Sequence, residues 1–270
     1  MPDAVKHSIF SKSSEFNLGG GRLKAIITDL DGTLLRSDKT ISEYTVRVFT
    51  ECRKRGMMIF AATARPERSV KAYRDQIVFD AVTTLNGAKI ILNGHFFENV
   101  IPHFSGEKVL AGILEIPGIL ISVETREGLF ANIDRPEWGS VFFEGFPKLP
   151  EKGSLYKILI SGENVVSRAQ IERVLTEDVY CTAAGGNLFQ IMSKKATKWN
   201  GIKVMLDSFG ICENEAVYFG DDYDDAEPIR NCGMGVAVSN ANSDVISAAK
   251  YITLSNDEDG PAHFIEQNLL

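Results

Sequence analysis

Two aspartates that stand one residue apart follow a short apolar segment near the start of the chain. Residues 25–28 read Ala-Ile-Ile-Thr and predict a buried strand, which Asp29 and Asp31 follow directly, and Gly32 then lets the backbone turn sharply. Two carboxylates at the end of a buried strand are costly to fold unless their charge is offset. A metal ion and an anionic substrate would offset it, so the pair predicts metal-dependent chemistry on an anion.

Three further polar features stand at corresponding places later in the chain. Thr63 ends an apolar run at 57–62, Lys198 opens a predicted helix, and an acidic loop from Gly220 to Asp225 follows a predicted strand. Each has an ordinary explanation when taken alone, because aspartate-rich loops cap helices and surface lysines are common. If there were no shared site, four unrelated explanations would have to hold at once, in this order along the chain, and we regard that as the weaker interpretation. The four features together favour one ligand site at the strand ends of a doubly wound sheet.

Apolar runs alternate with amphipathic stretches over most of the chain. Strands are predicted at 25–28, 57–62, 81–85, 216–219, 235–238 and 251–254, and helices at 42–55, 66–76, 198–209 and 243–250. Short apolar strands joined by helices favour parallel βαβ units with right-handed crossovers. The sequence therefore predicts an α/β fold with a doubly wound, mostly parallel, Rossmann-like core sheet.

The middle of the chain has a different pattern. Strands are predicted at 119–125, 129–133 and 156–161, with helical stretches near 105–114 and 165–175 and several turn residues between them. We therefore predict an α+β cap domain at 101–188, inserted into a core formed by residues 23–100 and 189–270. Residues 1–22 are predicted to form a flexible N-terminal tail.

Composition restricts the class of partner and the compartment. Of 270 residues, 44% are hydrophobic and 24% charged, as in an ordinary globular protein, and the net charge of −7 argues against nucleic acid or an anionic membrane as main partner. No stretch approaches the length of a membrane span, and residues 1–22 hold no apolar run of signal-peptide length. The four cysteines are far apart without zinc-ligand spacing, so we expect reduced thiols in a cytoplasmic protein.

The motifs resemble those of the haloacid dehalogenase superfamily, and within it the Cof-type phosphatases. Asp29–Thr33 matches the first motif Asp-x-Asp-Gly-Thr, Thr63 the second, Lys198 the third, and Gly220–Asp225 the fourth, Gly-Asp-x-x-Asn-Asp. Further similarity lies at 86–88, 240–241 and 259–260, so the resemblance covers nearly the whole chain from about residue 22. The insert stands between the second and third motifs, which resembles the type II cap of subclass B.

Two positions depart from the pattern of this family. Ala64 stands where the family usually has glycine, and since alanine tolerates fewer backbone conformations, the loop can be set differently. Asp224 stands where the family usually has asparagine. This extra carboxylate would either tighten cation binding or disfavour a dianionic substrate.

The resemblance implies a Mg²⁺ site and a set of residues around it. The metal ligands would be the carboxylates of Asp29 and Asp221 and the backbone carbonyl of Asp31, because Mg²⁺ suits oxygen ligands in a site that keeps waters. The supporting acidic residues would be Asp222, Asp224 and Asp225, the last acting through water or by holding Lys198.

The resemblance also implies the catalytic roles. Asp29 would be the nucleophile that forms an aspartyl-phosphate, and Asp31 the acid that protonates the leaving oxygen and then the base that activates water. Thr63 and Lys198 would bind the transferring phosphoryl group. Ala64 and Arg65 are assigned to phosphate or substrate binding beside them. Asn86 and Asn240 are candidates for orienting loops around the site.

The resulting prediction is a Mg²⁺-dependent phosphoric monoester hydrolase for small phosphorylated metabolites, with sugar phosphates first. A phosphomutase or phosphotransferase of the same fold is the alternative within enzymes, because a phospho-aspartate can also transfer to a sugar hydroxyl. A non-catalytic regulator that binds a phosphorylated ligand is the second alternative, although such proteins usually lose the aspartates and lysine that this chain keeps. The sequence names neither the physiological substrate nor the oligomeric state.

Overall fold

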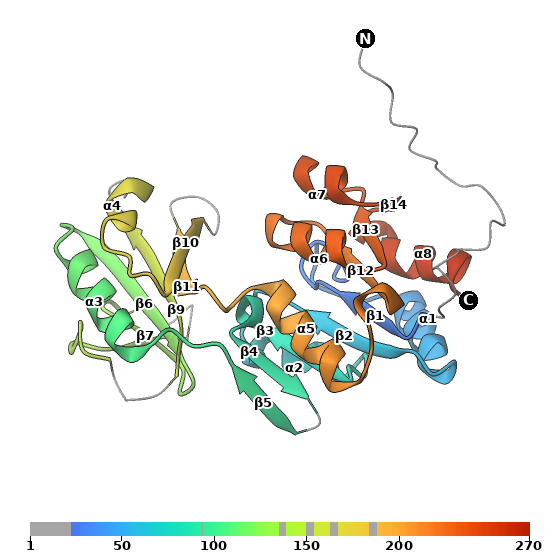
Figure 1. The fold of residues 1–270 in the computed structure, drawn as a ribbon, viewed down its shortest axis with the longest axis horizontal. Helices are drawn as coiled ribbons and strands as arrows, with labels where there is room; N and C mark the ends of the chain where they lie inside the picture. Colours follow the sequence, from blue (N-terminus) through green and yellow to red (C-terminus); the bar gives the residue numbers. More distant parts are fainter. Residues whose placement is uncertain (1–22, 93, 135–138, 150–153, 163–166, 184–187) are drawn as a thin grey trace, which may run out of the picture. The chain divides into compact units, whose positions relative to one another are not determined.

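The computed structural model describes residues 23–92, 94–134, 139–149, 154–162, 167–183 and 188–270 (Figure 1). The predicted tail at 1–22 lies outside these described residues. The chain divides into two compact units, one made of the chain up to Phe96 together with Lys198–Leu270, and the other made of Phe97–Thr197. We call them the core unit and the inserted unit.

The core unit is built on a sheet in the order β14-β13-β12-β1-β2-β3-β4-β5. These strands are β14 (Tyr251–Thr253), β13 (Met234–Val238), β12 (Ala216–Gly220), β1 (Ala25–Thr28), β2 (Met58–Ala62), β3 (Ala81–Thr84), β4 (Lys89–Leu92) and β5 (His95–Glu98). Strands from β14 to β3 pair in parallel, and β4 runs antiparallel to β3. The predicted α/β class with a mostly parallel sheet is confirmed.

Helices cover both faces of this sheet. They are α1 (Glu43–Lys54), α2 (Glu67–Arg74), α5 (Lys198–Ser208), α6 (Ala226–Asn231), α7 (Ser243–Ala248) and α8 (Gly260–Asn268). Neighbouring residues of a strand point to opposite faces. Ile26 accordingly packs in a core with Phe49 of α1 and Phe264 of α8, whereas Ile27 packs in a second core with Met205 of α5. The parallel strands are therefore buried on both sides, as a doubly wound sheet requires.

Parallel pairing brings three loops to one edge of the sheet. Thr28 of β1 is in register with Ala61 of β2 and with Phe219 of β12, so these neighbouring strands end close together. The segments that follow β1, β2 and β12 begin with Asp29, Thr63 and Asp221. The predicted site residues are thus placed by the register of the three central strands.

The inserted unit has its own sheet, in the order β10-β11-β9-β6-β7-β8, and its own apolar core. The elements are α3 (His103–Leu114), β6 (Ile119–Thr125), β7 (Leu129–Ala131), β8 (Val141–Phe142), β9 (Leu155–Gly162), α4 (Arg168–Glu172), β10 (Val179–Ala183) and β11 (Phe189–Ser193). Because β11 pairs with β9 and β10, residues 189–197 belong to this unit and not to the core, where the sequence placed 189 onward. No strand is predicted from the sequence at 189–193, so there was no reason to group these residues with the inserted unit.

No helix in the described ranges is long and apolar enough to cross a membrane.

Candidate active site

Lys198 is the only cation that the described structure pairs with a cluster of carboxylates at the end of β1 and after β12. Its Nζ lies 3.0 Å from Oδ1 of Asp29, 2.6 Å from Oδ1 of Asp225 and 2.9 Å from Oδ1 of Asp224. Burial alone would lower the pKa of Lys198, but the charges of Asp224, Asp225 and Asp29 outweigh it and raise that pKa well above its ordinary value. The lysine is therefore a fixed positive charge inside the site.

Close packing of α5 against the sheet puts Lys198 in this place. The lysine is the first residue of α5, and Gly201 lies one turn later. A Cβ at Gly201 would lie 2.3 Å from Oγ1 of Thr83 in β3 and 3.2 Å from Cα of Gly87. Only glycine lets the first turn of the helix approach the sheet this closely, so Gly201 indirectly sets the position of the ammonium group.

Asp225 is fully occupied by groups of the protein. Its Oδ1 accepts hydrogen bonds from Lys198 and from the hydroxyl of Tyr218, and its Oδ2 accepts from the backbone N–H groups of Asp221 and Asp222, at 2.9 and 3.0 Å. The residue is fully buried, and a Cβ at Gly220 would lie 2.5 Å from its own Cβ. Asp225 therefore contacts Lys198 and holds the backbone at the start of the acidic loop.

Asp29 and Asp221 belong to a cluster of carboxylates whose negative charge exceeds the single positive charge of Lys198. Ligand oxygens of Asp29, Asp221 and Asp225 lie within 4.8 Å of one another. Burial raises the pKa of Asp29 well above its ordinary value and that of Asp221 to about 6, although Lys198 acts against the first and the hydroxyl of Thr33 against the second. With Asp224, whose pKa burial also raises, the cluster sets four carboxylates against one ammonium. A divalent cation with oxygen ligands fits this donor set, and it would compensate the surplus charge.

The turn after Asp31 brings Asp221 to the cluster. Oγ1 of Thr33 donates to Oδ1 of Asp221 at 2.6 Å. Gly32 has a φ of +75°, and a Cβ there would lie 2.5 Å from Oδ2 of Asp221. Asn240 donates from Nδ2 to the carbonyl of Gly32 at 2.8 Å and so holds this turn from the other side. The glycine and threonine of the first motif thus position an acid from the fourth.

The carboxylate of Asp31 lies in a different environment from that of Asp29. Arg65 donates to both of its oxygens, from Nε at 2.5 Å and from Nη2 at 2.7 Å, and Nζ of Lys39 lies 2.8 Å from Oδ1. Partial burial would raise the pKa of Asp31, but the hydrogen bonds from Arg65 and Lys39 lower it overall. The two aspartates of the first motif therefore have pKa values displaced in opposite directions.

Thr63 is held by the segment that follows β3. Its backbone N–H donates to the carbonyl of Thr83 at 2.9 Å, its carbonyl accepts from the N–H of Asn86 at 3.0 Å, and its Oγ1 accepts from the N–H of Arg65 at 3.1 Å. The hydroxyl proton of Thr63 is thus not used in these contacts. Ala64 is exposed and its φ is not positive, so alanine fits this loop without backbone strain.

The site includes side chains that sequence reasoning did not assign. Tyr218 is fully buried and donates to Asp225. Because side chains alternate between the two faces of a strand, its place two residues before Gly220 in β12 could have indicated that it shares a face with the acidic loop. Lys39 contacts Asp31 from a turn with a φ of 66°, for which the sequence offers no signal. Thr33 belongs to the first motif, but its contact with Asp221 depends on the folded register.

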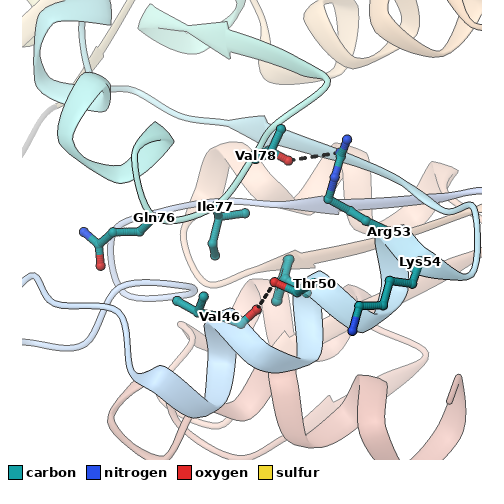
Figure 2. A pocket seen from close by; sticks show the side chains of 8 residues that line it. Val46, Thr50, Arg53, Lys54, Gln76, Ile77 and Val78 are labelled. Atoms are coloured by element: carbon teal, nitrogen blue, oxygen red, sulfur yellow. Dashed lines mark hydrogen bonds between the residues drawn. The ribbon is translucent and has the colours of Figure 1, made fainter.

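A separate cavity of about 370 Å³ lies between α1 and the segment after α2 (Figure 2). Its walls include Val46 and Ile77, and Arg53 donates from its rim to the carbonyl of Val78 at 3.2 Å. The described lining contains none of the acidic cluster. This cavity is therefore not the site at the strand ends.

Polar groups converge at the carboxyl edge of a doubly wound sheet, and their surplus of negative charge suits a cation. The chain belongs to the haloacid dehalogenase-like hydrolase family, whose model matches residues 26–265. The resemblance seen in the motifs is confirmed, and so is the class of enzyme, a phosphoric monoester hydrolase.

Similar proteins cover almost the whole chain. The 5-amino-6-(5-phospho-D-ribitylamino)uracil phosphatase YitU of Bacillus subtilis is 28% identical over 269 residues, which span 90% of this chain and 96% of the relative. Among solved structures, the phosphatase BT1666 of Bacteroides thetaiotaomicron has a TM-score of 0.81 at 22% identity, covering 92% of this chain and 96% of that one. The subclass IIB sugar phosphatase BT4131 has a TM-score of 0.74 at 22% identity, covering 90% and 98%. The two structures establish the fold, including the inserted unit.

Proposed function

We propose that this protein is a Mg²⁺-dependent phosphatase that hydrolyses small phosphorylated metabolites, sugar phosphates first, through an aspartyl-phosphate. The observation that carries the proposal is the contact of buried Lys198 with Asp29, beside Asp221. Together these residues provide a nucleophilic carboxylate, a fixed positive charge for a phosphoryl group, and oxygen ligands for a cation.

The reaction divides into two displacements at phosphorus. In the first, an oxygen of Asp29 forms a bond to phosphorus while the ester bond breaks, and Asp31 gives a proton to the leaving oxygen. In the second, water attacks the aspartyl-phosphate, Asp31 takes its proton, and the bond from Asp29 to phosphorus breaks to release phosphate. Lys198 and the hydroxyl of Thr63 hold the phosphoryl oxygens in both steps.

Mg²⁺ would be held by the carboxylates of Asp29 and Asp221 and the carbonyl of Asp31, and when bound it supplies positive charge that offsets the repulsion between Asp29 and the phosphate. Asp225 is saturated by protein donors, so in this proposal it positions Lys198 and is not a ligand. Asp222 and Asp224 complete the acidic loop, and Asp224 shares Lys198.

The substrate class is proposed from the relatives. YitU is named for a phosphorylated ribityl compound, and BT4131 is named as a sugar phosphatase. Both names describe small polyhydroxylated phosphate esters. We assign the core unit to catalysis, and the inserted unit, Phe97–Thr197, to the role of a cap that selects the leaving group. The cytoplasmic location stays a prediction.

The experiment is a phosphate-release assay on a panel of phosphorylated metabolites, with Mg²⁺ and with EDTA, for the unaltered chain and Asp29→Asn. We expect Mg²⁺-dependent release by the unaltered chain and a loss of at least about a thousandfold in the variant, since the nucleophile is removed. Asp207→Asn is the matched control, because Asp207 is an exposed aspartate on α5. Mg²⁺-dependent turnover by Asp29→Asn at the unaltered rate would refute the mechanism. A labelled sugar phosphate converted to an isomer, without release of phosphate, would favour the phosphomutase.

A further inference from the structure

Arg65 donates two parallel hydrogen bonds to the carboxylate of Asp31. Nε donates to Oδ2 at 2.5 Å and Nη2 donates to Oδ1 at 2.7 Å. A forked pair of this kind fixes the plane of a carboxylate as well as its position, which one ammonium group cannot do. The side chain of Arg65 is 22% exposed and that of Asp31 is 40% exposed, so the arginine is the more enclosed partner.

Arg65 is itself held from several sides. Its guanidinium carbon lies 5.2 Å from the centre of the ring of Tyr73, a buried residue of α2. Its backbone N–H donates to Oγ1 of Thr63 at 3.1 Å, and its carbonyl accepts from the N–H of Leu85 at 3.0 Å. The guanidinium of Arg65, in the segment after β2, is therefore held in place and orients the carboxylate of Asp31, which follows β1.

We propose that Arg65 is a positioning residue for Asp31 and not a ligand of the substrate phosphate. This inference rests on the proposed function. The sequence assigned Arg65 to phosphate binding, but the two nitrogens described above are committed to Asp31. In the proposed reaction Asp31 moves a proton twice, to the leaving oxygen and then from water. Arg65 aims the oxygens of Asp31 at those two atoms.

The inference separates steps that need Asp31 from a step that does not. Nitrophenolate is a good leaving group and departs without a proton, whereas the alkoxide of a sugar requires one. For 4-nitrophenyl phosphate, kcat/KM reports attack by Asp29 alone, and kcat also contains hydrolysis of the aspartyl-phosphate. For a sugar phosphate, kcat/KM already includes protonation by Asp31.

The test measures kcat and kcat/KM of Arg65→Met with 4-nitrophenyl phosphate and with the best sugar phosphate of the panel. We expect kcat/KM for the sugar phosphate and kcat for the aryl ester to fall about 10-fold to 100-fold, because a misdirected acid–base group loses much of its contribution. We expect kcat/KM for the aryl ester to change less than about threefold. Stopped-flow mixing should show a burst of nitrophenolate, since hydrolysis of the aspartyl-phosphate has become slow.

Three further variants make the result decisive. Adding Arg65→Met to Asp31→Asn should cost no further activity, because Arg65 acts through Asp31. Arg65→Lys should recover part of the sugar phosphatase activity, as one ammonium restores a single bond. Arg68→Met, an exposed arginine in α2, should behave as the unaltered chain does. Thermal unfolding of each variant with Mg²⁺ identifies any loss that is due to misfolding.

Two results would overturn the inference. If Arg65→Met lowers kcat/KM equally for both esters and raises both KM values, Arg65 binds the phosphoryl group. If Arg65→Met and Arg65→Lys leave kcat and kcat/KM unchanged for both esters, the hydrogen bonds from Arg65 to Asp31 have no role in turnover. Failure of the proposed function is distinct from both, because the unaltered chain would then release no phosphate from either ester.

Discussion

Asp221→Asn should stabilise the metal-free protein at pH 8 and remove its stabilisation by Mg²⁺. Burial and neighbouring carboxylates raise the pKa of Asp221 from 3.8 to about 6. That difference corresponds to about 3 kcal/mol that ionisation of this group costs the folded state. Asparagine keeps an oxygen that can accept the hydrogen bond from Thr33, and it carries no charge at any pH.

The sign of the pH dependence follows from the raised pKa. The folded state binds the proton of Asp221 more tightly than the unfolded chain does, so its stabilising effect is complete below about pH 4. This effect is lost as the pH rises through 6, above which the carboxylate costs its full amount. The variant should therefore gain little at pH 4. At pH 8 it should gain about 1–3 kcal/mol, because the loop relaxes around a partly buried group, and about 2–10 °C in Tm.

Thermal unfolding in EDTA and in excess Mg²⁺, at both pH values, measures this gain. At a hundred times its Kd, Mg²⁺ should stabilise the unaltered chain by about 2.7 kcal/mol and leave the variant unchanged. Asp207→Asn is the matched control, because Asp207 is an exposed aspartate on α5, outside the acidic cluster. The reasoning fails if Asp221→Asn is the less stable protein in EDTA at pH 8, or if Mg²⁺ stabilises it as much as it does the unaltered chain.

Two further substitutions examine the support of Lys198. Tyr218→Phe removes the hydroxyl that donates to buried Asp225, so it should lower the free energy of unfolding in urea by about 1–3 kcal/mol. Tyr223→Phe, at an exposed tyrosine, is the control and should leave that free energy unchanged. Equal effects of the two substitutions would contradict the role of the hydroxyl. Asp224→Asn removes a negative charge 2.9 Å from Lys198 and should lower KM for a dianionic phosphate ester a few-fold, with a similar kcat, in steady-state assays. A higher KM would instead indicate that the carboxylate serves cation binding.

Local patterns sufficed for the elements that place the site. The apolar runs before Asp29, Thr63 and Asp221 predict parallel strands whose ends share an edge, and the register of β1, β2 and β12 bears this out. The strands β4 and β5, between 89 and 98, were not predicted. β11 was assigned to the wrong unit, because strand partners are chosen by contacts far away in the sequence.

The sequence predicted which side chains lie at the site, but not which of them contact one another. The grip of Arg65 on Asp31 joins residues 34 positions apart, and the contact of Thr33 with Asp221 spans 188. Nothing in either local sequence marks such a pair, since each residue type has many solvated uses. Motif spacing therefore identified which residues gather at the strand ends, but not that Arg65 faces a carboxylate.

The first motif places two like carboxylates in opposite environments. Asp29 is buried against other carboxylates, so its pKa is raised, whereas Arg65 and Lys39 lower the pKa of Asp31. A nucleophile must be ionised, so Asp29 needs more positive charge than Lys198 supplies, and a cation shared with Asp221 would supply it. Asp31, the proposed acid and base, must carry a proton before it can donate one, so the cationic neighbours that lower its pKa favour its second role, in which its carboxylate takes a proton from water.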